Sequence, residues 1–589
     1  MKKSLLFSAV LAGLMLGSCS SSDDLNGGGN NTGSNQSGDG YVAFTINMPS
    51  QPGSSSRAGS ENDQFDAGMK SEYDVKNATL LLFDGVDESK AQFKMAYPLN
   101  TAPWTNKGNT DNVTTTSATI VQQVEAPSTN YLALVVLNSN NVFTLGTNGS
   151  ITIDGSSFSG TLNDFLAKST ATDGKDLTKA GFYMANAPLA NKVGGSSDPS
   201  GATINTLVSL DGKIKETEAE AKSAPAEIYV ERGVAKVTMQ KGSVTSVAGS
   251  KPASSSSSSA SDVAFEVNSW TLDNTNKTTY LVRSTEGYGS WLSLASNATP
   301  GVTNKYRFVG SNEVGSGMYR TYFAKDPNYD TTGDSSPTFN SSATFSSEFG
   351  NENPQYCFEN TFDVDHQIDK YTTRVLIKAN LNSGSTFYVI NGDENTIFDR
   401  TAVEKEIKKQ FLLEYGSWIK ANVTSPTTVD ENSLTVDFTD GAGAVTLNSI
   451  EITGVTYVSG VASLPSDYKE TVMARLGSIQ EYKNGESYYS VRIKHFGDNL
   501  TPWNSTETEK PSSTTGVYPS GTNRDGNYLG RYGVLRNNWY DIEVQGVKGL
   551  GSPTVPTVTT DTDDELKSYI AVKINVLSWA KRTQGAILH

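Results

Sequence analysis

Alternation of apolar and polar residues with a period of two is the feature that most constrains how this chain folds. A period of two places every second side chain on the same face of a β-strand. The pattern recurs along the sequence, at residues 78–83, 131–137, 373–379 and 488–494. Helical patterns are scarce, and we expect helices only at 401–415 and 466–476, as insertions between strands. The sequence therefore predicts a mainly β fold with a few short inserted helices.

Polar turn sequences separate many of these strands. Asn484-Gly485 lies between two strand-like runs, and this dipeptide is a strong hairpin signal. Residues 84–87 and 437–441, each with two aspartates and a glycine, are also interpreted as turns. Calcium binding by these aspartates is the weaker interpretation.

The length of 589 residues predicts two or more domains. The clearest linker candidate is 242–262, which contains the serine run 254–259. We therefore place a boundary at its start, which gives an N-terminal domain over 58–241 and a C-terminal domain over 242–560. The alternative is that this stretch is a long surface loop within one domain.

Charge and cysteine content exclude some classes of protein. The formal net charge of −16 disfavours binding to nucleic acid or to an anionic membrane. Cys357 is the only cysteine after Cys19, so the body of the chain has no internal disulfide and depends on its core for stability.

The N-terminus reads as an export signal. Two lysines precede an apolar run that is too short to span a membrane, which fits a secretory signal peptide over 1–19. Leu16-Gly17-Ser18-Cys19 is similar to a bacterial lipobox, so we expect Cys19 to carry lipid. The alternative is an ordinary signal peptide with an incidental cysteine.

A single arginine separates this leader from the first domain. Arg57 is the only basic residue in 20–57, and small polar residues on both sides expose the bond to Ala58. We expect an arginine-specific protease to cut there. Segment 20–57 would then be a propeptide that contains a flexible tether and one strand over 41–48. The apolar face of this removable strand consists of Val42, Phe44, Ile46 and Met48.

A second strand of similar length lies near the C-terminus, at 569–579. The preceding stretches, 553–560 rich in Pro and Thr and 561–565 rich in acidic residues, have the composition of a mobile arm. The strand could fill a groove in a neighbouring molecule or complete its own domain, and the sequence alone leaves both open. Its apolar face consists of Ile570, Val572, Ile574 and Val576.

Several segments in this order resemble one family, the fimbrillins of Bacteroidales, which build type V pili. Within this family, the chain resembles the shaft subunit of the minor fimbrium. The similar segments are 229–237, 270–277 with 280–282, 359–361 with 372–375, 482–485 with 488–489, and 536–542 with 549–551. The resemblance covers nearly the whole chain and is weakest from about 98 to 195.

The resemblance implies two transthyretin-like β-sandwich domains in tandem, followed by a donor-strand arm over 561–589. It also implies donor-strand exchange, in which proteolysis removes the N-terminal strand and the C-terminal strand of the next subunit replaces it. The chain would begin as an outer-membrane lipoprotein, and then polymerise with itself and with accessory subunits into a surface fimbrium that supports adhesion to host or bacterial surfaces. The alternatives are an accessory anchor or tip subunit, or a non-polymerising lipoprotein that binds glycan or host.

Sequence signals for an enzyme are lacking. The three histidines, His366, His495 and His589, show no metal-ligand spacing. The chain has no Gly-x-Ser-x-Gly sequence and no phosphate-binding glycine loop. We therefore expect no catalytic residue, no metal site, no cofactor and no nucleic-acid partner.

Overall fold

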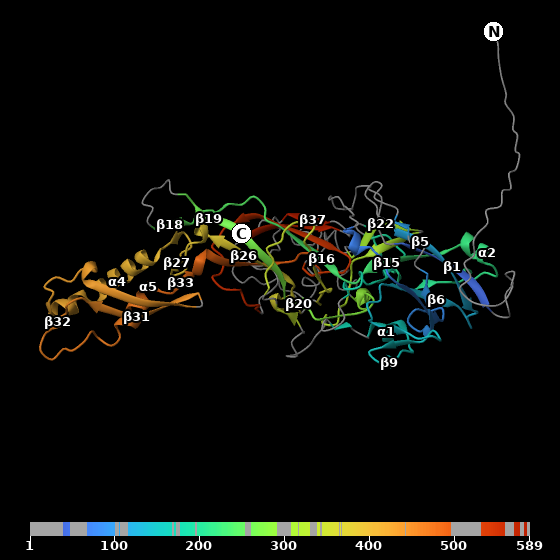
Figure 1. The fold of residues 1–589 in the computed structure, drawn as a ribbon, viewed down its shortest axis with the longest axis horizontal. Helices are drawn as coiled ribbons and strands as arrows, with labels where there is room; N and C mark the ends of the chain where they lie inside the picture. Colours follow the sequence, from blue (N-terminus) through green and yellow to red (C-terminus); the bar gives the residue numbers. More distant parts are fainter. Residues whose placement is uncertain are drawn as a thin grey trace, which may run out of the picture.

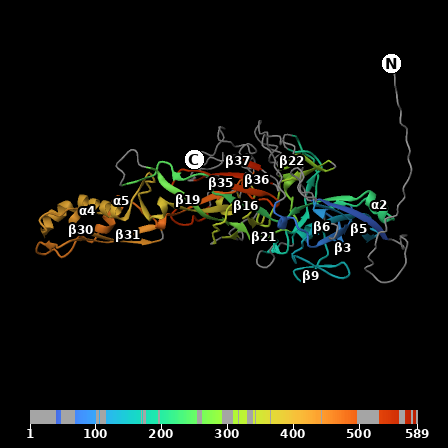
Figure 2. The ribbon, with the colours of Figure 1, turned by 45° about the horizontal axis from the view of Figure 1, so that its top comes forward.

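The computed structural model describes residues 39–47, most of 68–559, 570–577 and 582–585. The longer gaps within the main span are 107–115, 172–176, 254–260, 291–307, 330–338 and 496–529. The described chain consists mainly of β-strands, which confirms the predicted class. Three parts follow one another along the long axis: an N-terminal sheet, a central pair of sheets and an α/β insertion at the far end (Figures 1 and 2).

The N-terminal part is built on one nine-stranded sheet with a large apolar core. Two of its strands, β2 and β6, do not alternate as we expected: they have an apolar side chain at nearly every position, because both faces of the paired strands are buried. The strand order is β3 (Gln92–Leu99), β2 (Ala78–Asp84), β6 (Tyr131–Leu137), β11 (Met184–Asn186), β15 (Ala226–Arg232), β1 (Asp39–Asn47), β5 (Thr116–Glu125) and β4 (Thr105–Asn106), with β14 (Val208–Ser209) paired to β6.

The central part consists of two sheets that enclose a second core. Side chains from both sheets meet there, for example Ile542 from one and Ile377 from the other. The first sheet has the order β25 (Gln355–Cys357), β16 (Ala235–Gln240), β35 (Trp539–Val547), β36 (Ile570–Leu577) and β37 (Arg582–Gly585). The second has the order β17 (Ser246–Val247), β19 (Val263–Asp273), β26 (Arg374–Leu381) and β34 (Glu486–Arg492).

The division at residue 242 that we expected differs from the structure. The chain passes from the first part to the second at Gly233-Val234, between β15 and β16, because β16 already pairs with β35. Both strands that flank 242–262, β16 and β19, belong to the central part, and β17 within this stretch pairs with β19, so the stretch lies inside the central part and does not separate two domains. Later residues also return to the first part, where β23 (Met318–Thr321) pairs with β12 (Leu189–Ala190).

The insertion forms a third core of its own. Helix α4 (Arg400–Asn422) buries Val403, Ile407, Phe411, Tyr415 and Ile419, spaced four residues apart. It packs with α5 (Tyr468–Leu476) against the hairpin of β30 (Leu434–Gly441) and β31 (Ala444–Ile452). Both predicted helices are confirmed.

The remaining elements are short. A three-stranded sheet contains β7 (Thr144–Leu145), β8 (Ile151–Ile153) and β9 (Ser156–Ser157). The sheet of β12 and β23 also includes β13 (Ile204–Asn205) and β22 (Val309–Gly315). Two-stranded pairs are β10 (Thr170–Ala171) with β21 (Thr278–Thr279), β18 (Lys251–Pro252) with β28 (Thr396–Ile397), β20 (Thr275–Asn276) with β24 (Phe339–Asn340), β27 (Phe387–Ile390) with β33 (Ile479–Tyr482), and β29 (Val423–Ser425) with β32 (Thr456–Tyr457). Short helices are α1 (Leu162–Leu166) and α2 (Glu218–Ser223).

Candidate assembly site

The predicted removable strand is an internal strand of the N-terminal sheet. All nine residues of β1 pair antiparallel with β5, from Asp39 opposite Glu125 to Asn47 opposite Ser117. On the other edge, residues 44–47 pair in parallel with β15. Tyr41 extends this edge through two backbone hydrogen bonds of 2.7 and 2.8 Å with Lys215. Since both edges are paired, removal of β1 would open a slot between β5 and β15.

The inward face of β1 belongs to the N-terminal core. Val42, Phe44 and Ile46 are each 0% exposed. Burial of three such side chains contributes about 5–9 kcal/mol at roughly 1.5–3 kcal/mol each. Met48, the fourth predicted member of this face, lies outside the described residues. The structure thus brings together the three predicted residues that it describes.

The outward face of β1 is more polar and lies beside β15. Thr45 is half-buried, and its hydroxyl lies 3.3 Å from that of Thr119 on β5. On the other side, Thr45 lies opposite the exposed Glu227 in the parallel register. Ala43 is different, because it is only 1% exposed and leaves no room for a solvated polar side chain. These two positions determine which outward residues another strand could place here.

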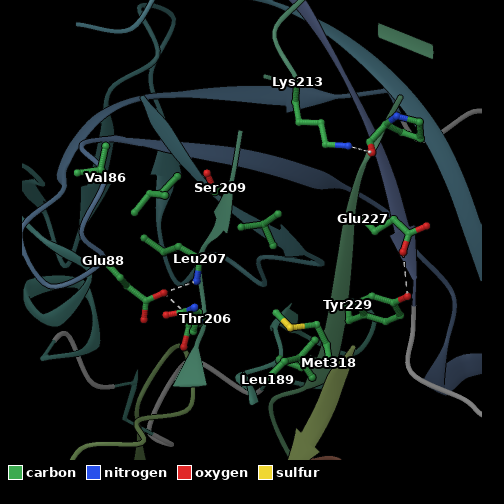
Figure 3. A pocket seen from close by; sticks show the side chains of 15 residues that line it. Val86, Glu88, Leu189, Thr206, Leu207, Ser209, Lys213, Glu227, Tyr229 and Met318 are labelled. Atoms are coloured by element: carbon green, nitrogen blue, oxygen red, sulfur yellow. Dashed lines mark hydrogen bonds between the residues drawn. The ribbon is translucent and has the colours of Figure 1, made fainter. Parts of the chain in front are cut away.

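A pocket of about 520 Å³ lies on the outer side of β15 (Figure 3). Glu227 and Tyr229 line it and are joined by a hydrogen bond of 3.1 Å, donated by the Tyr229 hydroxyl. Across the pocket, Glu88 accepts hydrogen bonds from the backbone N–H groups of Thr206 and Leu207, at 2.8 and 2.6 Å. Burial raises the pKa of Glu88. Lys213 donates to the carbonyl of Pro225 at 3.2 Å, so several polar groups in the pocket are already bound to the protein itself.

Cys19, Arg57 and Ala58 lie outside the described residues. The first described element after the predicted cut is the short helix η1 (Lys70–Glu72). Its Glu72 is fully buried and accepts hydrogen bonds from the Tyr356 hydroxyl and from the backbone N–H of Met69. Its carboxylate also pairs with Lys236 at 2.8 Å. The chain that follows the predicted cut is thus fixed to the central part.

Charged residues are also buried around the contact between η1 and the central part, and they were not among the predicted site residues. Arg232 donates to the Glu72 carbonyl at 2.7 Å, and Arg283 binds Glu231 through two hydrogen bonds of 2.9 Å. A charged residue normally indicates a solvated position. The one sequence signal is that Lys236 lies between apolar neighbours in a strand-like run.

The predicted donor strand is paired within its own chain in this structure. β36 runs antiparallel to β35, with Ile574 opposite Ile542 and Val572 opposite Val544. The register therefore places 570, 572, 574 and 576 opposite residues of β35 that face the central core, namely Val547, Val544, Ile542 and Tyr540. Of the two possibilities left open by the sequence, the single chain adopts the pairing with its own sheet.

The arm before β36 is held more firmly than its composition suggests. The N–H of Thr559 donates to Asp369 and its carbonyl accepts from the N–H of Lys370, both at 2.9 Å. The carbonyl of Pro556 accepts a hydrogen bond from Arg374. The backbone of residues 556 and 559 is thus bound by Asp369, Lys370 and Arg374, and the composition of 553–559 does not predict these contacts. Residues 560–569 lie outside the described part.

Other chemistry is sparse in the described part of the chain. Within it, no group of three or more histidine, cysteine, aspartate or glutamate side chains is arranged to hold a metal ion. Among the same residues, no helix is both long and apolar enough to cross a bilayer. Cys357 is buried in β25, and burial raises the pKa of its thiol to about 12. Such a thiol is a poor nucleophile, because the thiolate is the reactive form.

Comparisons with known proteins identify the C-terminal region. Residues 517–585, which include β35, β36 and β37, match a family model described as "Major fimbrial subunit protein type IV, Fimbrillin, C-terminal". No curated protein sequence matches the chain.

Three solved structures are similar to the chain at low sequence identity. A proposed cell adhesion protein from Parabacteroides distasonis ATCC 8503 shares 9% identity over 94% of this chain and 99% of its own, with a TM-score of 0.35. A proposed cell adhesion protein from Bacteroides eggerthii DSM 20697 shares 11% identity over 95% of this chain and 99% of its own, with a TM-score of 0.30. A fimbrial assembly protein from P. distasonis shares 12% identity over 59% of this chain and 82% of its own, with a TM-score of 0.23.

Proposed function

The chain belongs to the fimbrillin family, and on this premise we propose that it is the polymerising shaft subunit of a cell-surface fimbrium. In this proposal the chain is exported as a lipoprotein through Cys19 and is anchored in the outer membrane. An arginine-specific protease cuts it between Arg57 and Ala58. Subunits built on two transthyretin-like sandwiches then join by donor-strand exchange.

The position of β1 carries this proposal. β1 lies on the N-terminal side of Arg57, and its only covalent link to the rest of the sheet passes through the bond to Ala58. Cleavage there would allow β1 to leave. Its departure would expose the apolar groove left by Val42, Phe44 and Ile46 and the unpaired edges of β5 and β15. An open sheet edge beside an apolar groove readily accepts another strand.

Contacts of residues that follow the cut favour a controlled release. Residues that follow the cut stay fixed through the buried Glu72, so loss of β1 need not unfold β2. At the other end of the chain, Thr559 is anchored and 11 residue steps lead from it to Ile570. An extended chain spans about 3.3–3.6 Å per residue, so the C-terminal strand could reach roughly 36–40 Å from Thr559 into a neighbouring subunit.

The proposal is tested by blocking and then moving the cut. Arg57→Ala should leave a lipid-anchored precursor that gives no polymer ladder on an unheated gel. Arg57→Lys keeps the charge, and should also block an arginine-specific protease. Ser56→Arg combined with Arg57→Ala moves the arginine by one residue and should restore both cleavage and the ladder. A normal ladder from Arg57→Ala, with β1 retained in the fibre by mass spectrometry, would refute release of β1 as the switch.

An accessory subunit is the nearest alternative. An anchor that keeps its lipid should not be cut at Arg57, and a tip subunit needs no donor strand. This chain has both an arginine at the expected cut and a strand-like run near its C-terminus, which favours the shaft subunit. A non-polymerising glycan-binding lipoprotein has less support, because Glu88, Glu227 and Lys213 in the pocket are engaged within the protein. We propose accessory subunits, the processing protease and host or bacterial surface ligands as further partners.

A further inference from the structure

The strands β1 and β36 have closely similar sequences. Residues 41–48 read Tyr-Val-Ala-Phe-Thr-Ile-Asn-Met, and residues 569–576 read Tyr-Ile-Ala-Val-Lys-Ile-Asn-Val. Four of the eight positions are identical, and the four positions of the inward face are apolar in both. One outward position changes in character, where Lys573 corresponds to Thr45. Because the neighbours of each β1 residue on β5 and β15 are known, the alignment assigns neighbours to each residue of 569–576 as well.

The register of β1 gives each residue of the incoming strand a place. With the two sequences aligned, Ile570, Val572 and Ile574 take the positions of Val42, Phe44 and Ile46. Lys573 takes the position of Thr45, which lies opposite Glu227 on β15. Glu227 is exposed, and the Tyr229 hydroxyl binds one of its two carboxylate oxygens, so the carboxylate can also accept from a lysine on the neighbouring strand.

The burial of Ala43 decides the direction in which the strand enters. In the direction of β1, Ala571 takes the buried position of Ala43 and Asn575 takes that of Asn47. In the reverse direction the inward face is still apolar, but Asn575 would take the position of Ala43 if Lys573 stays opposite Glu227, and Lys573 itself would take it if the strand shifts by two residues; Ala43 is only 1% exposed. Burying an amide at that position without a hydrogen-bond partner is unfavourable.

The pairing of β36 within its own chain gives its lysine and its inward face the same kinds of partner. There Lys573 lies opposite Glu543 on β35, and Ile574 lies opposite Ile542. A glutamate opposite Lys573 and apolar partners on the inward face are therefore available to this strand at both locations. This equivalence favours exchange of the strand between them.

We propose that residues 570–577 of one copy occupy the β1 slot of the next copy in the direction of β1, parallel to β15, with Ala571 at the position of Ala43 and Lys573 opposite Glu227. This inference rests on the proposed donor-strand function and adds the register, the direction and the pair that selects them. Glu227 and Lys573 are positioning residues in this arrangement.

The direction is tested by disulfide cross-linking between copies in the assembled fibre. Ala43 lies opposite Val121 on β5, so Ala571 of the incoming strand should lie there too. Cells that assemble the polymer would express two full-length variants together, one with Ala571→Cys and one with Val121→Cys. A mild oxidant should then give a covalent dimer that survives heating in SDS without reductant. The matched control pairs Asn575→Cys with Val121→Cys and should give no dimer above the wild-type background.

Each outcome separates the register from the proposed function. A dimer only from the Asn575→Cys pair would show the reverse direction. An intact ladder with no dimer from either pair would place the strand elsewhere. Either result would overturn this inference and leave the proposed polymer in place. Absence of a ladder from the wild-type chain itself would instead refute the proposed polymer. As a second measurement, Glu227→Lys should shorten the ladder and Glu227→Lys with Lys573→Glu should restore it. A double variant no better than the single would contradict the pairing.

Discussion

Glu72 and Lys236 form an ion pair with 2.8 Å between Oε1 and Nζ, and neither side chain is more than 1% exposed. The pair joins the first described element after Arg57 to β16 of the central part. Lys236 also lies 3.9 Å from the centre of the Trp539 ring, which adds a cation–π contact. This arrangement fixes the chain on the far side of the predicted cut, so cleavage can free β1 while the remaining sheet stays in place.

Removal of one partner of this pair should be costly. A buried charge that loses its partner destabilises a protein by about 3–5 kcal/mol, so we expect Lys236→Met to lower the free energy of unfolding by about that amount. The double variant Lys236→Met with Glu72→Gln should recover part of the loss. The exposed pair of Lys222 with Glu218 on α2 is the control, and Lys222→Met should cost less than about 1 kcal/mol. Urea unfolding followed by tryptophan fluorescence measures all three.

The contribution of β1 should depend on processing. Phe44 is fully buried in the precursor, and truncation of such a side chain costs about 3–5 kcal/mol. We therefore expect Phe44→Ala to lower the melting temperature of the uncleaved chain and to leave that of the assembled fibre unchanged, because the strand has been lost. Leu134→Ala on β6 is the control and should destabilise both forms. Equal destabilisation of precursor and fibre by Phe44→Ala would mean that β1 stays in place.

The strands near the two ends of the chain were predicted well, because the alternation of residue types along them shows which side chains share the apolar face. The run 41–48 and the run 569–579 both contain strands, β1 and β36. The run 437–441 was predicted as a turn from its aspartates and glycine, but it continues β30, since Phe438 is buried in the third core between exposed polar neighbours. Local turn chemistry was outweighed there by tertiary packing.

Pairing and caps were harder to predict than strands. Asn484 and Gly485 adopt positive φ angles of 53° and 67°, which confirms a tight turn. The flanking strands do not form a hairpin, because β33 pairs with β27 and β34 pairs with β26. Helix α4 begins at Arg400, one residue before the predicted start, and is capped by Asp399, whose side chain accepts from the N–H of Ala402 at 2.7 Å. Sequence shows which residues can make such contacts, whereas long-range packing decides which do.

Asp326 should make stability depend on pH. It is 1% exposed, accepts hydrogen bonds from the backbone N–H groups of Asn328 and Thr361, and burial raises its pKa from 3.8 to about 7. The folded chain therefore holds a proton here that the unfolded chain releases above pH 3.8. The stabilisation is fully present below that pH and is lost as the pH rises to about 7, with a slope of up to about 1.4 kcal/mol per pH unit.

Replacement of this carboxyl by an amide isolates the effect. Between pH 4 and pH 7 the wild-type chain should lose stability relative to Asp326→Asn, which does not titrate. Urea unfolding at several pH values gives the difference between the two proteins, in which all other titrating groups cancel. Parallel stability curves for the two proteins would show that Asp326 is ionised in the folded chain.

The final prediction concerns the two alternative locations of the C-terminal strand. Residues directly opposite each other in an antiparallel pair share a face of the sheet, so Ile574 and Val576 share that of Ile542 and Tyr540. Carboxylates at both positions should therefore disfavour the pairing within the chain and, under the proposed exchange, the pairing with a neighbour. We expect Ile574→Asp with Val576→Asp to lower the melting temperature of the monomer and to abolish the polymer ladder. Asn575→Ser, on the opposite face, should change neither. A monomer that melts normally but does not polymerise would mean that the strand contributes only in the neighbour's groove, and an intact ladder would mean that subunits are joined through another surface.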